Sequence, residues 1–112
     1  MDNTNQEIGF VDLDGLQTVR TIGVAHDRLK AAIADHAAVR IGLDGLEEFD
    51  LSLVQLVLAA RRGALAAGKS LILAGPVRGP LYVTLDRAGF LSRDAADSLG
   101  GATFWLQASG DQ

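Results

Sequence analysis

The sequence lacks cysteine and has no concentration of basic residues, and each absence excludes classes of function. Without cysteine, the chain of 112 residues has no disulfide framework, no thiolate metal ligand and no thiol nucleophile. This composition suits a reducing compartment. The formal net charge of −4 and the scattered arginines argue against nucleic acid as the main partner, because phosphate binding needs a concentrated basic surface.

Long apolar runs are also lacking, although 48% of the residues are hydrophobic. A membrane-spanning helix needs about 20 consecutive apolar residues, and the opening MDNTNQE has no basic and apolar leader. We therefore expect a cytoplasmic protein without direct membrane insertion. Its length predicts one domain over residues 8–107, with a flexible N-terminus over 1–7 and a tail over 108–112.

Residues 39–74 are the most regular part of the sequence and predict a βαβ unit. Apolar segments at 39–43 and 70–74 predict two buried strands. Between them an apolar helix begins at Asp50-Leu51-Ser52 and ends at Gly68, a residue type that adopts the left-handed conformation after a helix. The acidic stretch before this helix predicts a turn.

The flanking segments predict further strands and helices. Asp14-Gly15 between two β-compatible segments predicts a hairpin, and Thr21 is placed to cap an amphipathic helix. We predict one sheet, covered by helices through right-handed crossovers. Its central strands are expected at 16–20, 39–43 and 70–73 and a last strand at 103–106, with helices at 22–36, 52–67 and 81–88 and a polar helical turn at 92–99.

Groups with catalytic or metal-binding chemistry are not found at usable spacing. The loop Gly75-Pro76-Val77-Arg78-Gly79-Pro80 lacks the lysine and hydroxyl of a phosphate loop, and His26 and His36 have no acidic partner at ligand spacing. Glu47, Glu48 and Asp50 cluster before the central helix, where negative charge contributes about 0.3–1 kcal/mol per group without any catalytic role. We expect no enzymatic activity, no cofactor and no metal.

The central helix has two different faces. One is a broad apolar arc, and the other is mostly small, with one hydroxyl, one amide and one arginine. Two interpretations are open: a surface kept smooth for a docking partner, or alanine chosen for helix propensity. The smooth face consists of Ser52, Gln55, Ala59, Arg62, Gly63 and Ala66.

This stretch resembles the STAS domain, the fold of anti-sigma factor antagonists and of the cytoplasmic tail of sulfate transporters. The resemblance covers about residues 8–106. It rests on the hydrophobic strand, the Asp-x-Ser at a helix start, the Gly-Lys after that helix, the short strand that follows and a later helix ending in Gly-Phe. It implies an α/β fold with a single mixed, mostly parallel sheet covered by about four helices.

Asp50 and Ser52 match the family's Asp-Ser-Ser/Thr-Gly motif, while Leu51 and Leu53 depart from it. Ser52 falls on the residue that a partner kinase phosphorylates in the anti-sigma factor antagonists. The resemblance implies a bacterial signalling adaptor of the chemotaxis or two-component-associated type, with a histidine-kinase-like or anti-sigma ATPase partner. The alternative is a cytoplasmic STAS subunit that docks on the ATPase of a phospholipid transport system without phospho-switching.

Two interpretations of Ser52 follow from the sequence. Ser52 and Gln55 fit an S-x-x-Q capping box, in which Ser52 caps the helix and contributes about 1 kcal/mol. If Asp50 caps instead, Ser52 lies in the first turn as a candidate phosphorylation site. The partner-binding residues are then expected to be Asp50, Ser52, Gln55, Ala59, Arg62 and Gly63.

Overall fold

The computed structural model describes residues 8–91 and 101–106. The chain divides into two compact units, Met1–Ala74 and Gly75–Gln112, which are described separately. The single domain over 8–107 stays a prediction, and the helical turn at 92–99 lies outside the described residues. The elements are β1 (Ile8–Asp12), β2 (Gly15–Gln17), α1 (Ile22–Asp35), β3 (Ala38–Gly42), β4 (Leu46–Phe49), α2 (Leu51–Ala66), β5 (Ser70–Leu73), α3 (Gly79–Arg87) and α4 (Gly101–Leu106).

A three-stranded parallel sheet forms the centre of the first unit, in the order β1-β3-β5. Residues alternate between its faces, as the period of two in a strand requires. The side chains of one face are buried and those of the other are exposed. The buried set is Val11, Val39, Ile41, Leu71 and Leu73, and the exposed set includes Ile8, Phe10, Arg40 and Ile72.

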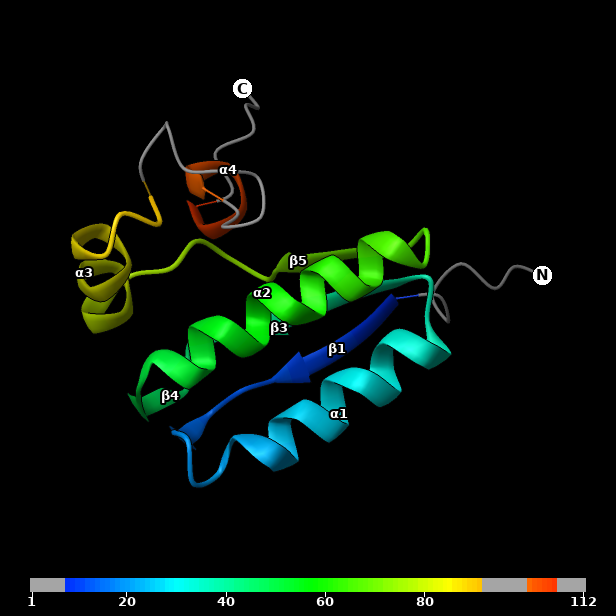
Figure 1. The fold of residues 1–112 in the computed structure, drawn as a ribbon, viewed down its shortest axis with the longest axis horizontal. Coiled ribbons are helices and arrows are strands. Elements are labelled where there is room, and N and C mark those ends of the chain that lie inside the picture. The colour runs from blue at the N-terminus through cyan, green and yellow to red at the C-terminus, as the bar shows by residue number, and fades with distance from the viewer. Residues whose placement is uncertain (1–7, 92–100, 107–112) are drawn as a thin grey trace. The chain divides into compact units, whose positions relative to one another are not determined.

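The helices α1 and α2 lie side by side and cover the buried face of this sheet (Figure 1). Each helix connects two parallel strands, so its apolar stripe faces the sheet. Leu29 of α1 and Leu53 and Val57 of α2 are almost fully buried. The predicted helix bounds at 22–36 and 52–67 agree with α1 and α2 to within one residue.

The hairpin predicted at Asp14-Gly15 is wrong, because β1 and β2 do not pair with each other. β2 pairs in parallel with β4 in a separate two-stranded ladder, so the segment 16–20 is not a central strand. The two Asp-Gly dipeptides lie opposite one another, where the Gly15 N–H donates to the Gly45 oxygen over 3.0 Å. A Cβ on Gly45 would lie 2.8 Å from the Asp14 Cβ, so this close approach needs glycine.

The turn predicted before the central helix is also wrong, because Leu46–Phe49 forms the strand β4. Glu47 and Glu48 are exposed there, without the regular alternation that marks a half-buried strand. Pairing with β2 organises this segment, and the β2 register is shifted between Gly15 and Leu16. The local sequence pattern therefore contained little signal for β4.

The second unit contains α3 and α4. Pro80 lies in the first turn of α3, and Gly89, with φ +86°, follows its C-terminus, as the sequence predicts. The last strand predicted at 103–106 is wrong, because this segment is the helix α4. Phe104 and Trp105 are buried and meet edge to face at 4.9 Å, so packing has overridden the β propensity of aromatic residues.

Candidate functional site

Asp50 is the N-cap residue of α2. Its backbone is extended, with φ −135° and ψ −172°, and its Oδ1 accepts the backbone N–H of Ser52 over 3.0 Å. The Ser52 hydroxyl also donates to Asp50 Oδ1. One carboxylate oxygen therefore holds both polar groups of the residue in the first turn of the helix.

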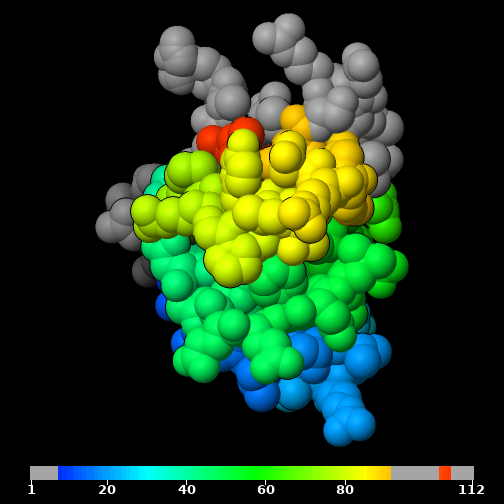
Figure 2. All heavy atoms as spheres, turned by 90° about the vertical axis from the view of Figure 1, so that its left-hand side faces the viewer, coloured from blue at the N-terminus to red at the C-terminus, as the bar shows by residue number. Residues whose placement is uncertain are grey.

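The other oxygen of Asp50 binds a different part of the chain. Oδ2 accepts the backbone N–H of Val19 over 2.9 Å, which ties the loop before α1 to the beginning of α2. Figure 2 shows this end of the molecule, with the blue segment before α1 against the green segment that begins α2. The Ser52 hydroxyl, followed by the Val19 N–H, lowers the pKa of Asp50 below its ordinary value.

The interpretation of Ser52 as the helix cap is wrong, because Asp50 occupies that position. Two residues further on, Ser52 lies in the first turn and is partly exposed. Its hydroxyl points back to the Asp50 carboxylate. The cap at Asp50 is the condition on which Ser52 was predicted as a candidate phosphorylation site, but the Ser52 hydroxyl contacts the Asp50 carboxylate instead of pointing outward as expected.

The smooth face of α2 is exposed in the structure. Gln55, Ala59, Arg62 and Gly63 are all exposed, and we call these four residues the docking face. Most of the opposite apolar arc is buried, as the helical wheel predicts. Two residues that the wheel places in this arc differ: Ala60 is half-buried, and Leu65 has a relative exposure of 54%.

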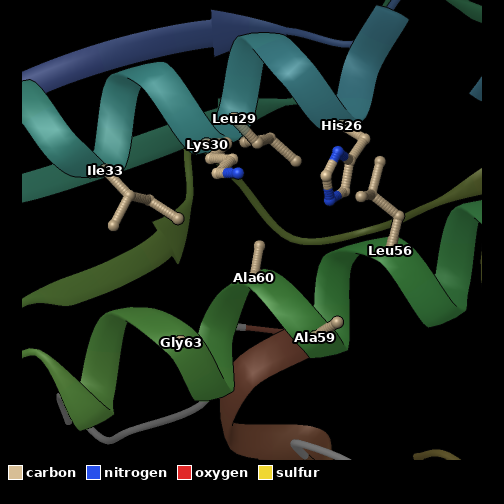
Figure 3. Close-up of a pocket in the computed structure, with 8 residues that line it drawn as sticks. All are labelled: His26, Leu29, Lys30, Ile33, Leu56, Ala59, Ala60 and Gly63. Carbon is tan, nitrogen blue, oxygen red and sulfur yellow. The ribbon is translucent and has the colours of Figure 1, made fainter. Parts of the chain in front are cut away.

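A groove of about 230 Å³ lies between α1 and α2, next to the docking face. Figure 3 shows the side chains of α1 pointing across it toward those of α2. This groove was not predicted from the sequence, because the periodicity of one helix does not show which face of the other helix lies against it. The residues that line it are His26, Leu29, Lys30 and Ile33 of α1, and Leu56, Ala59, Ala60 and Gly63 of α2.

The C-terminal ends of α1 and α2 are also tied together. Gly68, with φ +76°, follows α2, and the Lys69 N–H donates to the Ala64 oxygen over 2.8 Å in a Schellman arrangement. The Lys69 ammonium donates to the Ile33 oxygen, and to the Ala34 oxygen over 3.3 Å. These are the last carbonyls of α1, where a cation is favourable.

Of the two histidines considered from the sequence, His26 lines the groove, and its Nδ1 lies 3.5 Å from the Asp27 carboxylate. Within the described parts of the chain, no group of three or more His, Cys, Asp or Glu residues could hold a metal ion. None of the helices in those same parts is long and apolar enough to span a membrane.

Comparison with known proteins gives two findings. A family model described as "Mlab, STAS domain" matches residues 2–91. The chain is also similar to the solved "Structure of the Bacillus Cell Fate Determinant SpoIIAA in the Phosphorylated Form", with 21% identity over 75% of this chain and 77% of that one, and a TM-score of 0.59. No curated protein matches. The structural similarity confirms the α/β fold class predicted from the sequence.

Proposed function

The chain belongs to the STAS domain family, and we propose that it is a non-enzymatic bacterial signalling adaptor. Its partner is a kinase-like protein or an anti-sigma-type ATPase, which binds the docking face together with Asp50 and Ser52. Phosphorylation of Ser52 by that partner releases the complex. The observation that carries this proposal is the partly exposed Ser52, held by the Asp50 cap at the head of the docking face.

The docking face has the properties of a protein-binding surface. Ala59 and Gly63 add little bulk, so a partner approaches the helix closely and few side chains lose freedom on binding. Arg62 supplies one cation with five donors, a residue type enriched in interfaces. A face selected only for helix propensity would not contain glycine, which costs about 1 kcal/mol relative to alanine in a helix.

The contacts of Ser52 support a role in switching. A phosphate at this hydroxyl removes the proton donated to Asp50 and adds a charge of about −1.5 to −2 beside its carboxylate. The like charges repel, and the contact of Asp50 with the Val19 N–H is weakened. The modification thus changes both the charge at the head of the docking face and the position of the loop before α1.

The test compares Ser52→Asp and Ser52→Ala for thermal stability and for capture of the partner from a native lysate. The proposal expects Ser52→Ala to bind as the wild type does and Ser52→Asp to lose the partner, with both chains folded. Mass spectrometry after incubation of the lysate with ATP should place a phosphate on Ser52. Equal capture by both variants, with no phosphate on Ser52, would contradict the switch.

The docking face is tested separately. Ala59→Glu or Arg62→Glu should reduce partner capture while the melting temperature changes little, because both positions are exposed. Ala31→Glu is the matched control, since Ala31 is an exposed alanine of α1 outside the groove. Capture that survives both docking-face substitutions would place the partner elsewhere.

A second function is favoured by the departures from the phosphorylated motif. Leu53, at the position of the motif glycine, is almost fully buried, so the first turn of α2 is packed into the core. We therefore also consider a cytoplasmic STAS subunit that docks permanently on the ATPase of a phospholipid transport system. In that case the docking-face variants lose the partner, whereas Ser52→Ala captures it normally and ATP leaves Ser52 unmodified.

A further inference from the structure

The groove between α1 and α2 has the form of a site for a helix. Its lining residues on α1, from His26 to Ile33, are spaced i, i+3, i+4 and i+7, and those on α2, from Leu56 to Gly63, have the same spacing. Two parallel stripes therefore face each other for two helical turns, or about 10 Å. Figure 3 shows both stripes turned toward the same opening.

The floor of the groove is apolar and its α2 wall is low. Leu29 and Leu56 are buried, with relative exposures of 1% and 9%, whereas Ala59 and Gly63 are exposed and small. A Cβ added at Gly63 would meet no atom within 4 Å. The groove, at about 230 Å³, is smaller than the roughly 300–1,000 Å³ of small-molecule pockets, which favours apolar side chains of a partner over a whole small molecule.

The groove also has a cationic rim, although the chain as a whole carries a net charge of −4. Lys30 lines it and is exposed, and no ion pair of Lys30 occurs within residues 8–91 and 101–106. Arg62 is exposed on the neighbouring turn of α2. The acidic Asp27 is not among the residues that line the groove. An occupant with acidic side chains beside its apolar stripe complements this rim.

We infer that the groove binds an amphipathic helix of a partner protein, with two or three large apolar side chains at i, i+3 or i+4 and i+7 and acidic residues beside them. This is recognition of a helix in an apolar groove. The inference deepens the proposed function, because Ala59 and Gly63 belong to both the docking face and the groove. It adds α1 to the binding surface and assigns the partner segment a secondary structure and a charge.

The experiment uses a displayed library of 14-residue helical peptides, with apolar residues fixed at the stripe and randomised flanks, selected on the whole chain. Enriched peptides should have acidic flanks. Fluorescence anisotropy should show a loss of affinity on the order of tenfold for Gly63→Leu, which fills the groove, and a smaller loss for Lys30→Glu. Gly63→Leu should still fold, since leucine is a better helix former than glycine.

Two matched controls keep the test specific. Ala31→Leu adds the same side chain at an exposed position of α1 outside the groove, and Arg28→Glu makes the same charge change two residues from Lys30, about 200° around the helix. Both should bind the enriched peptides as the wild type does. The selection needs neither kinase nor ATP, so a failed Ser52 switch leaves its result unaffected.

Three results would overturn the inference. One is selection without enrichment of any peptide. Another is enrichment of peptides with basic flanks, or of peptides that bind Gly63→Leu as tightly as the wild type. The third is a wild-type dimer in sedimentation that Gly63→Leu dissociates, because the occupant would then be a second copy of this chain.

Discussion

The two ends of the α1–α2 pair are tied in different ways. At the N-terminal end the side chain of Asp50 reaches the loop before α1 through the Val19 N–H. At the C-terminal end the ammonium of Lys69 reaches the last carbonyls of α1. The first tie depends on a carboxylate that also binds the Ser52 hydroxyl, whereas the second joins a cation to backbone oxygens.

Because of this difference, a change of charge at Ser52 or Asp50 acts on the N-terminal tie and not on the C-terminal one. A phosphate on Ser52 or a proton on Asp50 alters the N-terminal tie, since both act on the same carboxylate. Neither affects Lys69, whose acceptors are backbone carbonyls. In the proposed switch, the C-terminal tie stays in place when the N-terminal tie changes, and the groove lies between the two ends.

The largest loss of stability is expected for a substitution at the C-terminal end of the α1–α2 pair. Lys69→Met keeps most of the apolar stem but removes the hydrogen bonds to Ile33 and Ala34. Because hydrogen bonds to charged groups contribute about 1.5–3 kcal/mol, the free energy of unfolding should fall by roughly that amount. Urea denaturation measures it, with Lys30→Met as the matched control on α1. Equal stability of the two variants would show that the C-terminal tie contributes nothing.

A somewhat smaller decrease in the free energy of unfolding is expected for Gly68→Ala. Gly68 has φ +76°, and a residue with a Cβ in the left-handed conformation costs about 1–2 kcal/mol. The substitution strains the turn from which Lys69 reaches α1, so it tests the same end through the backbone. A stability equal to that of the wild type, in the same urea experiment, would mean that the turn relaxes without cost.

A gain in stability, rather than a loss, is expected for the substitution of a glycine in the middle of α2. Gly63 is exposed within α2, and a Cβ there meets no atom within 4 Å. Gly63→Ala should therefore raise the free energy of unfolding by about 0.5–1 kcal/mol, because glycine loses more conformational freedom on folding. Thermal and urea melts beside those of Gly68→Ala would show whether the two glycines differ as expected. Destabilisation by Gly63→Ala would indicate a bend that alanine does not allow.

The smallest effect is at the N-terminal end and depends on pH. Asp50→Asn keeps an acceptor for the Ser52 N–H but loses the charge. The pKa of Asp50 is lowered in the folded state, so its contribution is present above the ordinary aspartate pKa of about 3.9 and is lost as the pH falls through the lowered value. The wild type should be more stable than Asp50→Asn near neutral pH, and the difference should disappear in acid.

Melting curves between neutral pH and strongly acidic pH measure this difference, with Asp35→Asn as the matched control on α1. A difference that stays constant across the whole range would show that the charge of Asp50 plays no part in the tie. A difference that grows in acid would contradict the sign of the pKa shift.

The sequence was sufficient for the elements whose signals are local. The glycine after α2 and the proline at the start of α3 fix helix ends within a few residues, and both were predicted correctly. The sequence narrowed the cap of α2 to Ser52 or Asp50, and the structure places Asp50 there. The strands β3 and β5 are short apolar segments at the expected places. The sequence also placed Asp50 and Ser52 at the beginning of α2, because a helix start depends on neighbouring residues, and their roles in partner binding stay predictions.

The wrong predictions concern elements that depend on contacts distant in the sequence. β4 exists through pairing with a strand about thirty residues earlier, and Trp105 lies in a helix in which its ring is buried, against the β propensity of aromatic residues. The Asp-Gly dipeptides resembled hairpin turns, yet each lies between strands that do not pair with each other, and the two dipeptides are joined by the hydrogen bond from the Gly15 N–H to the Gly45 oxygen. Predicting the groove requires knowing that Leu29 of α1 and Leu56 of α2 face one another, and the sequence pattern of one helix does not show this.

The parallel register also determines the order in which this chain folds. Ile8 pairs with Ala38, and Ala38 pairs with Ser70, so each pairing in the three-stranded sheet spans a whole helix and waits for a long loop to close. No two-stranded hairpin is available among the described strands to nucleate the sheet. Folding should therefore begin with α1 or α2 docking on its own strands, and its rate should be set by these distant contacts rather than by local helix formation.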